Sequence, residues 1–572
     1  MDVVQEAAGP GGATVGCRAD PDEAGGRRWY RRRIGGPALE LVVAVGVAVG
    51  FTYWARNLTD NPMERIGQVS ALAALQFRFA VVAVVLLAAL VATVRGRFTR
   101  YRPVVLRVAC AGLAGLASAL VAAALVFALR GTVWPLNGQY GDTGQLATWA
   151  TDIIHGKGIQ PFYPPAFPYL LAWWSQAFTG GNTWHGLQQM EILTTALYGP
   201  TAYAAWRLTV RPPWALAMVV VGAMPLIAPY KPYTNIVLVM LVPLFARFVR
   251  GMRRAAGRGP RRNAVGAVLA GAGFGVLFLV YSGWYVWAAP GMLVAALASV
   301  PWARGRRARL VSLGYAAGAA VVAFLVSAVN LIPLLTSASS GTTDRYAYFD
   351  TYIEPTYIAM FRFNLPAGAT TLSWPPPGEL GGVGVFTLLL LAGLGVALTL
   401  GPRLPLVMTA AGFTAGAWLM RMWFAQHMSR DHAVQLYPRT TVLILYCLLV
   451  LCVYAAKLAS ERTRAVREMT ARRGRVAVVA ALASVTLLTA MIGSSTGNRF
   501  LPTSPSAQSA GSETWNAQRL RQPDGSCSPY WAKTQGKGGC DEPTPKAVPN
   551  PAPTDHLFKG NLDDLIGVMA GD

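Results

Sequence analysis

Hydrophobic stretches of about 20 residues recur along the chain and alternate with polar segments. A helix needs about this length to cross roughly 30 Å of hydrocarbon. The pattern predicts an all-α polytopic membrane protein with about 13 transmembrane helices. The predicted spans are 38–54, 71–94, 104–129, 187–206, 214–230, 234–249, 264–281, 284–300, 310–335, 383–400, 406–424, 440–456 and 476–492.

One apolar stretch, AFPYLLAWWSQAF at 166–178, is too short to span and is rich in Trp. Such a stretch is typical of an interfacial helix at the headgroup level. The domain organisation predicted from these patterns has three parts. They are a disordered cytoplasmic leader (1–36), a transmembrane domain (37–492) with main outer loops at 130–186 and 336–382, and a periplasmic tail (493–572).

Composition and charge support the membrane class. Only 13% of the residues are charged, roughly half the share in an ordinary soluble domain. The net charge of +24 is carried by clusters between the apolar stretches, such as RRWYRRR and RFVRGMRRAAGRGPRR. The positive-inside rule places these clusters on the cytoplasmic side, and an odd number of spans then places the tail outside. No aromatic base-stacking platform accompanies the clusters, so the bilayer is an expected partner and nucleic acid is not.

Two cysteines of the tail, Cys527 and Cys540, flank a Gly- and Lys-rich stretch. Both are predicted to lie outside, where a disulfide between them is chemically sensible. The rest of the tail is rich in Pro, Ser and Gly, and only short patches such as the one around Trp515 are expected to pack on the membrane domain.

The decapeptide NGQYGDTGQL at 137–146 is polar and lies in the first long outer loop. Its carboxylate, Asp142, sits in a Gly-flanked turn that should expose it, which suits a general base. Asp152 is a second acidic candidate for the substrate site. The alternative is that Asp142 is a solvated turn residue or caps a helix that continues through Gln145.

Basic residues are few on the predicted outer side, and an ionisable residue at membrane depth is a candidate for function. The substrate-binding candidates are Lys231, Arg345, His427, Arg430, His432 and Arg439, with Arg421 nearby. The alternative is that Arg430 pairs with Asp431 and that Arg439 reaches the interface from a helix start.

Aromatic side chains can stack on sugars, and Tyr163 and Trp374, next to Pro runs in loops, are the best placed for this. Trp173 and Trp174 fit an interfacial aromatic belt better. The stretch HMSRDH lacks an obvious third ligand, so no metal or other cofactor is expected. Glu40 and Glu191 lie at span edges and are expected to be buried and hydrogen-bonded.

Several motifs together resemble one known family. They are GDTGQLATWATDIIHGKGIQPFYPPAFPYLLAWWS at 141–175, TTDRYAYFD at 342–350, SWPPPGELGGVG at 373–384 and MSRDHAVQLYPRTT at 428–441. With the order of spans, they resemble the actinobacterial arabinofuranosyltransferases, especially the galactan 5-O-arabinofuranosyltransferase (AftA) family, over most of residues 35 to 500.

The resemblance implies a GT-C-type bundle in the plasma membrane that transfers arabinofuranose, with inversion, from decaprenylphosphoryl-arabinose to cell-wall galactan on the periplasmic face. It gives Asp142 the place of the loop carboxylate used by such enzymes. Many members of the class carry paired acids there, whereas this chain has Gly141 before Asp142, so neither a two-carboxylate mechanism nor a loop-bound metal is expected. The periplasmic C-terminal module of the family also looks longer than this tail.

Three alternatives to this function remain. The same fold can take another polyprenyl-phosphate sugar, such as mannose, because fold does not fix the substrate. A transporter of lipid-linked sugars is the alternative from another class, and it would be expected to show inverted repeats and substrate groups inside the bundle. The sequence has no evident repeat, and its candidate acids lie in an outer loop. A non-catalytic scaffold for wall assembly is a third possibility.

Overall fold

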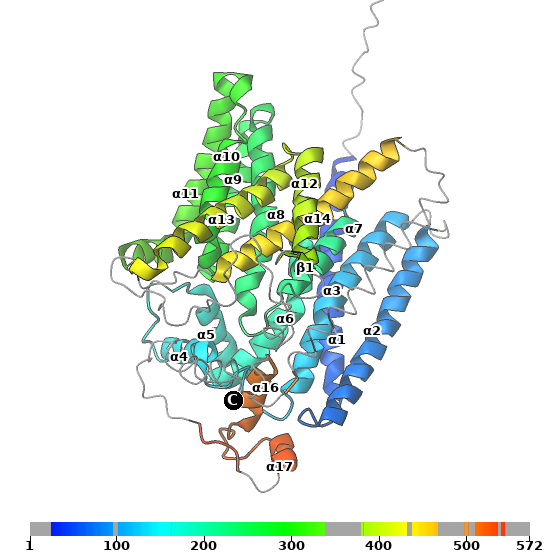
Figure 1. The fold of residues 1–572 in the computed structure, drawn as a ribbon, viewed down its shortest axis with the longest axis vertical. Coiled ribbons are helices and arrows are strands. Elements are labelled where there is room, and N and C mark those ends of the chain that lie inside the picture. The colour runs from blue at the N-terminus through cyan, green and yellow to red at the C-terminus, as the bar shows by residue number, and fades with distance from the viewer. Residues whose placement is uncertain are drawn as a thin grey trace, which may run out of the picture.

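The structure, a computed structural model, describes residues 25–94, 101–161, 163–337, 379–380, 383–431, 438–466, 493, 497, 501–502, 510–535 and 539–543. Nearly all regular structure in these residues is helical (Figure 1). The long helices are α1 (Gly25–Trp54), α2 (Arg65–Val94), α3 (Arg102–Ala128), α6 (Thr183–Arg207), α8 (Pro232–Arg254), α9 (Pro260–Val280), α10 (Gly283–Leu297), α11 (Arg306–Ser337), α12 (Val385–Leu400), α13 (Pro405–Asp431) and α14 (Pro438–Val466).

The shorter helices carry most of the features discussed below. They are α4 (Gly141–Ile154), α5 (Ala166–Phe178), α7 (Pro212–Ala217), α16 (Ala510–Arg519) and α17 (Pro529–Gln535). Single turns are η1 (Ala55–Asn57), η3 (Met224–Leu226), η4 (Ala255–Gly257) and η5 (Trp302–Arg304), and η2 (Met218–Ala223) is a π-helix. Strands β1 (Glu379–Leu380) and β2 (Val383–Gly384) pair antiparallel.

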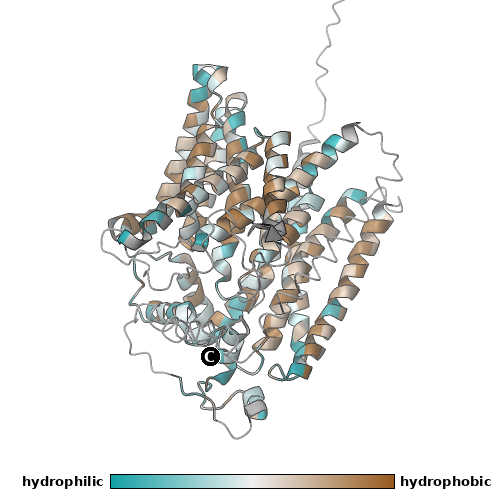
Figure 2. Cartoon of the chain, viewed as in Figure 1, coloured by the Kyte–Doolittle hydropathy of each residue, from teal (hydrophilic) through white to brown (hydrophobic). Residues whose placement is uncertain are grey.

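The prediction of an all-α polytopic membrane protein is confirmed. Within the described residues, 8 helical segments are long and apolar enough to cross a membrane. Figure 2 shows hydrophobic residues along the long helices and more hydrophilic ones around α4. The count of about 13 spans stays a prediction, because the last predicted span, 476–492, lies outside the described residues.

Helix α3 is at the centre of the first half of the bundle, and 94% of its most apolar window is buried. Small residues let its neighbours approach closely, as in other membrane helix packings. A Cβ added to Gly115 of α3 would collide with the carbonyl oxygen of Ala44 in α1, and one added to Gly199 of α6 would collide with that of Ala114 in α3. In the second half, Gly291 of α10 packs in the same way on the backbone of Gly412 in α13.

The predicted span 214–230 is interrupted in the structure. It consists of α7, the π-helix η2 and the single turn η3, and the chain then leaves the helix before α8 begins at Pro232. Pro225 has no N–H to continue the helical ladder, which explains an irregular turn at this place. Asn235 caps the break by donating from Nδ2 to the carbonyl of Leu226 at 2.6 Å. The break presents Tyr230 and Lys231 from a short loop.

The short helix predicted at 166–178 is α5, with the same bounds. One of its faces exposes large apolar side chains, among them Tyr169, Leu170 and Trp173. Helices α4, α5 and α16 lie together at one end of the long helices (Figure 1). The loop predicted at 130–186 and the described helix α16 of the tail therefore share one side of the bundle, as expected from the predicted topology.

Candidate active site

The turn that precedes Asp142 has an unusual backbone. Asn137, Gly138 and Gly141 have φ values of 65°, 59° and 59°, in the left-handed region that favours glycine. A Cβ on Gly141 would lie 2.7 Å from the hydroxyl of Tyr230, so the turn needs both the left-handed backbone and the missing side chain. Helix α4 begins at Gly141, which places Asp142 in its first turn.

Asp142 is held from two sides by the loop before α8. Its N–H donates to the hydroxyl of Tyr230 at 2.8 Å. Its carboxylate forms an ion pair with the ammonium group of Lys231. The side chain of Asp142 remains 45% exposed and that of Lys231 is 19% exposed, so the carboxylate is accessible while its cation is largely enclosed.

This arrangement excludes one alternative for Asp142, that it caps the helix. The N-cap position of α4 is Tyr140, and no side chain caps the helix there, so Asp142 is not the cap. A carboxylate in the first turn is favoured by the positive end of the helix dipole. An ion pair this exposed contributes only about 0–1 kcal/mol to folding stability. Its contribution to stability therefore does not by itself explain why the pair is present.

A second group of side chains lies beside the pair and is centred on Tyr233, two residues after Lys231. The hydroxyls of Tyr233 and Tyr163 are hydrogen-bonded at 2.8 Å, and Tyr233 stacks on Phe167 with ring centroids 4.1 Å apart. The Tyr233 ring also contacts that of Tyr281, and the guanidinium of Arg439 lies 5.2 Å from the centre of the Tyr281 ring. The group therefore brings phenol and guanidinium donors together, two residues along the chain from Lys231.

Tyr163 is fixed by residues from distant parts of the chain. Asn330 of α11 is fully buried and donates from Nδ2 to the carbonyl oxygen of Tyr163 at 3.0 Å. The ring of Trp149 packs on that of Tyr163 with centroids 4.2 Å apart. Burial raises the pKa of Tyr163, while the hydrogen bond with Tyr233 and the charge of Arg439 act in the opposite direction. The phenol is therefore protonated at neutral pH and can donate a hydrogen bond.

The fold thus pairs Asp142 with Lys231, and it gathers Tyr163 and Arg439 in the group centred on Tyr233, two residues after Lys231. Asp152 lies ten residues further along α4, about 15 Å along the helix axis, and pairs with Lys157 at 3.8 Å. Its role in substrate binding stays a prediction.

The other candidates lie on or near α13. His427 Nδ1 is hydrogen-bonded with the carbonyl of Trp423 at 2.6 Å, and Arg430 is exposed in the last turn. Arg421 is fully buried and donates to the hydroxyls of Thr440 and Thr441. Helix α13 extends to Asp431, seven residues beyond the end of the span predicted at 406–424. Their roles in donor binding stay predictions.

Three further candidates, Arg345, Trp374 and His432, lie outside the described residues. In the part of the chain that is described, no three His, Cys, Asp or Glu side chains are grouped so that they could hold a metal ion. Tyr230, Tyr233 and Asn330 were not among the predicted site residues. The signal for the two tyrosines was their position on either side of Lys231 in APYKPYTN.

Glu40 and Glu191 are buried and hydrogen-bonded, as expected. Glu40 is 2% exposed and accepts hydrogen bonds from Arg207. Glu191 is fully buried and accepts the N–H of Leu136 at 2.9 Å, so it fixes the start of the loop that leads to Asp142.

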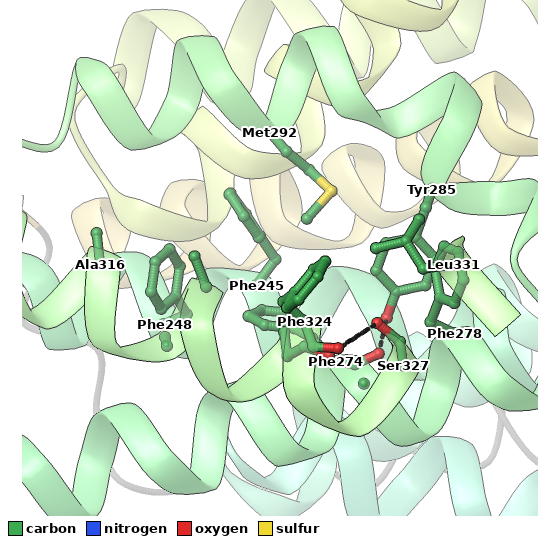
Figure 3. A pocket seen from close by; sticks show the side chains of 14 residues that line it. Phe245, Phe248, Phe274, Phe278, Tyr285, Met292, Ala316, Phe324, Ser327 and Leu331 are labelled. Carbon is green, nitrogen blue, oxygen red and sulfur yellow. Dashed lines mark hydrogen bonds between the residues drawn. The ribbon is translucent and has the colours of Figure 1, made fainter. Parts of the chain in front are cut away.

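An apolar cavity of about 350 Å³ lies among α8, α9, α10 and α11 (Figure 3). Its wall is formed mainly by Phe245, Phe248, Phe274, Phe278, Met292 and Phe324. The hydroxyls of the wall are engaged: Tyr285 donates to the carbonyl of Phe274 and Ser327 to that of Ala323. The cavity is therefore suited to a hydrocarbon chain.

One end of this cavity adjoins the polar group. Leu331 lines the cavity and directly follows Asn330, which holds Tyr163. Tyr285 also lines it, four residues after Tyr281, whose ring contacts Tyr233 and Arg439. A molecule with an apolar chain and a charged head could therefore occupy both places at once.

Comparison with known proteins gives few matches. No model of a known protein family matches the chain, and no curated protein matches it. Among solved structures, it is similar to the archaeal oligosaccharyltransferase AglB from Archaeoglobus fulgidus, in complex with an inhibitory peptide and a dolichol-phosphate. The sequences are 13% identical, the TM-score is 0.39, and the match covers 70% of this chain and 56% of that one.

The apo crystal structure of the Archaeoglobus fulgidus oligosaccharyltransferase is similar to the same degree. Its identity is 13% and its TM-score 0.36, with 68% of this chain and 56% of that chain covered. The present chain thus spans little more than half the length of these two proteins.

Proposed function

We propose that the protein is an inverting GT-C glycosyltransferase that uses a polyprenyl-phosphate sugar. The observation that carries this proposal is the accessible Asp142–Lys231 pair beside the Tyr163, Tyr233 and Arg439 group, at the end of an apolar cavity. A lipid-linked donor has the matching parts, because its hydrocarbon chain needs an apolar groove and its phosphate needs cations. The polyprenyl segment next to the phosphate would lie in the cavity.

In the proposed reaction, Asp142 takes the proton from an acceptor hydroxyl, and the oxygen of that hydroxyl attacks C1 of the sugar. A new C1–O bond forms on the face opposite the phosphate. The old C1–O bond breaks, and its electron pair leaves with the polyprenyl phosphate. Lys231 and Arg439 stabilise the charge that develops on the phosphate, and the neutral Tyr163 phenol donates a hydrogen bond.

For this to happen, Lys231 exchanges one anion for another. In the resting structure its ammonium group pairs with Asp142. Donor phosphate competes for the same cation, and its arrival leaves the Asp142 carboxylate free to act as a base. The accessible side of Asp142, 45% exposed, is where an acceptor hydroxyl could approach.

The specific sugar and acceptor rest on the sequence motifs. Their resemblance to the galactan 5-O-arabinofuranosyltransferase family supports decaprenylphosphoryl-arabinose as the donor and cell-wall galactan as the acceptor. We further propose that the protein is a multi-pass protein of the plasma membrane and that the site faces the periplasm, as the positive-inside rule indicates.

The test uses membranes that contain the full chain, labelled decaprenylphosphoryl-arabinose and a galactan acceptor. Asp142→Asn should reduce transfer by about 10²–10⁴-fold, as expected for loss of a general base, while donor binding persists. Asp60→Asn, in the loop between α1 and α2, is the matched control and should transfer normally. Full activity of Asp142→Asn would remove Asp142 from the mechanism.

A parallel series separates the alternatives. Polyprenyl-phosphate mannose replaces the arabinose donor in one set of reactions, and lipid-linked sugar movement across sealed vesicles is measured in another. Transfer from the mannose donor alone would correct the sugar and keep the class of enzyme. Movement of the lipid-linked sugar without formation of a glycosidic bond would overturn the enzymatic proposal.

A further inference from the structure

The C-terminal residues 510–535 and 539–543, here called the tail segment, lie against the loop that leads to Asp142 (Figure 1). Hydrogen bonds follow the loop from the end of α3 onward. Gln518 donates to the carbonyls of Ala128 and Arg130, Thr132 donates to Ala517, Gln522 donates to Gly131, and the Trp134 indole donates to Arg521. The expected packing of the patch around Trp515 on the membrane domain is confirmed.

The contacts closest to the site are made by α16. The N–H of Asn137 donates to the carbonyl of Glu513 at 2.8 Å, and Asn516 donates from Nδ2 to Oδ1 of Asn137 at 3.0 Å. A Cβ on Gly138 would collide with the side chain of Leu520. Asn137 is the single non-glycine residue with positive φ in the described part of the chain, a conformation that costs free energy and needs support. The tail segment provides that support.

The predicted disulfide between Cys527 and Cys540 is confirmed, and it keeps the tail segment folded on itself. It brings 539–543 alongside 519–521, where the N–H of Asp541 donates to Arg519 and the N–H of Arg521 donates to Asp541. Cys540 is buried with Met63 and Trp531 in a small separate core. The residues that this crosslink organises therefore adjoin Leu520 and Arg521, which contact Gly138 and Trp134.

We propose that the disulfide-closed tail segment is a clamp that positions the Asp142 turn, with Asn516 as its main positioning residue, so that turnover depends on the oxidised Cys527–Cys540 crosslink. The catalytic part of this inference rests on the proposed function of Asp142. The physical reason is that a displacement of about 1 Å in a reacting group can reduce a rate by two orders of magnitude. Asn516 acts through Asn137 and touches no substrate.

The first experiment measures the backbone amides directly. Hydrogen–deuterium exchange of residues 136–146 is followed in the full-length protein in lipid nanodiscs. Asn516→Asp removes the donor to Asn137 and keeps the side-chain shape, so exchange at Asn137 and Asp142 should become at least about tenfold faster through local opening. Glu542→Gln is the matched control, because it removes an exposed ion pair with Arg521 elsewhere in the tail segment and should leave this exchange unchanged.

The second experiment separates positioning from binding. With the lipid-linked donor, Asn516→Asp should reduce kcat by about tenfold and leave KM for the donor within about twofold, because the phosphate and prenyl contacts are intact. A general loss of folding would instead reduce the yield of folded protein and change both constants.

The third experiment tests the crosslink. Reduction of the wild type should accelerate amide exchange at 137–142 and reduce kcat by about tenfold. The Cys527→Ser/Cys540→Ser double variant should resemble the reduced wild type and should not respond further to the reductant, which assigns the effect to this disulfide and not to the other four cysteines, Cys17, Cys110, Cys447 and Cys452.

Unchanged amide exchange in both Asn516→Asp and the double variant would overturn the clamp. Faster exchange with unchanged kcat would also overturn it, because the turn would then need no positioning. If the variants exchange faster but the wild type transfers no sugar, the clamp is supported and the proposed function is contradicted. Failure of the clamp and failure of the proposed function are therefore distinguishable.

Discussion

The hydroxyl of Tyr230 accepts the backbone N–H of Asp142 at 2.8 Å, across a separation of 88 residues. The neighbouring Lys231 pairs with the carboxylate of the same aspartate. One short loop therefore fixes both the backbone and the charge of the proposed base. The interruption of the helix between η3 and α8 makes this possible, because a continuous helix would direct these two consecutive side chains about 100° apart.

Loss of the Tyr230 hydroxyl should weaken catalysis more than binding. In Tyr230→Phe the ring stays and the hydrogen bond to Asp142 is lost, so kcat should fall by about tenfold, within the range for a misplaced catalytic group. Steady-state kinetics with the lipid-linked donor measure this. Tyr169→Phe, exposed on α5, is the matched control and should behave as the wild type. An unchanged kcat in Tyr230→Phe would show that this bond does not position the base.

Lys231 should control donor affinity. Lys231→Gln removes the cation that is proposed to hold the phosphate, so donor KM should rise by about tenfold or more, and kcat should fall because the leaving group loses charge stabilisation. Lys231→Arg should recover part of the affinity, because the charge is kept while its geometry changes. Titration of donor binding checks both variants. Equal affinity in wild type and Lys231→Gln would contradict a phosphate contact.

Filling the apolar cavity should discriminate between donors by chain length. Ala320 lines the cavity on α11, and Ala320→Trp would occupy part of its volume. The KM of a decaprenyl donor should then rise by about tenfold, or 1.4 kcal/mol of binding free energy, whereas that of a short-chain analogue should change little. Leu325→Trp, on an exposed face of the same helix, is the control. Equal effects on both donors would remove the cavity from donor binding.

The junction of α5 and α6 should weaken in acid. His185 and Gln189 are hydrogen-bonded at 3.1 Å, and Gln189 accepts from the Trp174 indole. Burial, with a smaller effect of Arg56, lowers the pKa of His185. Its contribution to stability is therefore present above the unfolded pKa of about 6.5 and is lost as the pH falls through the lower folded value.

Thermal unfolding of the purified protein between pH 5 and 8 tests this. The wild type should melt at lower temperature as the pH decreases through this window. His185→Gln has no titrating side chain and should show a smaller slope. Identical slopes would assign the acid sensitivity to other groups.

The sequence alone determined the helical plan of this protein. The length of the hydrophobic stretches predicted helices such as α3 and α8. A peptide backbone in hydrocarbon has no water to bond, so its N–H and C=O groups must form hydrogen bonds within the helix. The few ionisable residues on the predicted outer side made Asp142, Lys231 and Arg439 candidates for the site, and a place beside Pro runs made Tyr163 one. The disulfide of the tail was predicted from the expected side of the membrane.

Only the tertiary structure decided which of these residues meet. Asp142 pairs with Lys231, and Tyr163 is held by Asn330, through contacts between segments that are far apart in the chain. The hydrophobic pattern predicts which segments span the lipid, but it does not tell which segments contact one another. It therefore could not predict the docking of α16 on Asn137. The irregular backbone within the span predicted at 214–230 was also hidden, because residues 218–227 are as apolar as those of a continuous helix, and the capping bond of Asn235 to Leu226 that stabilises it depends on the tertiary structure.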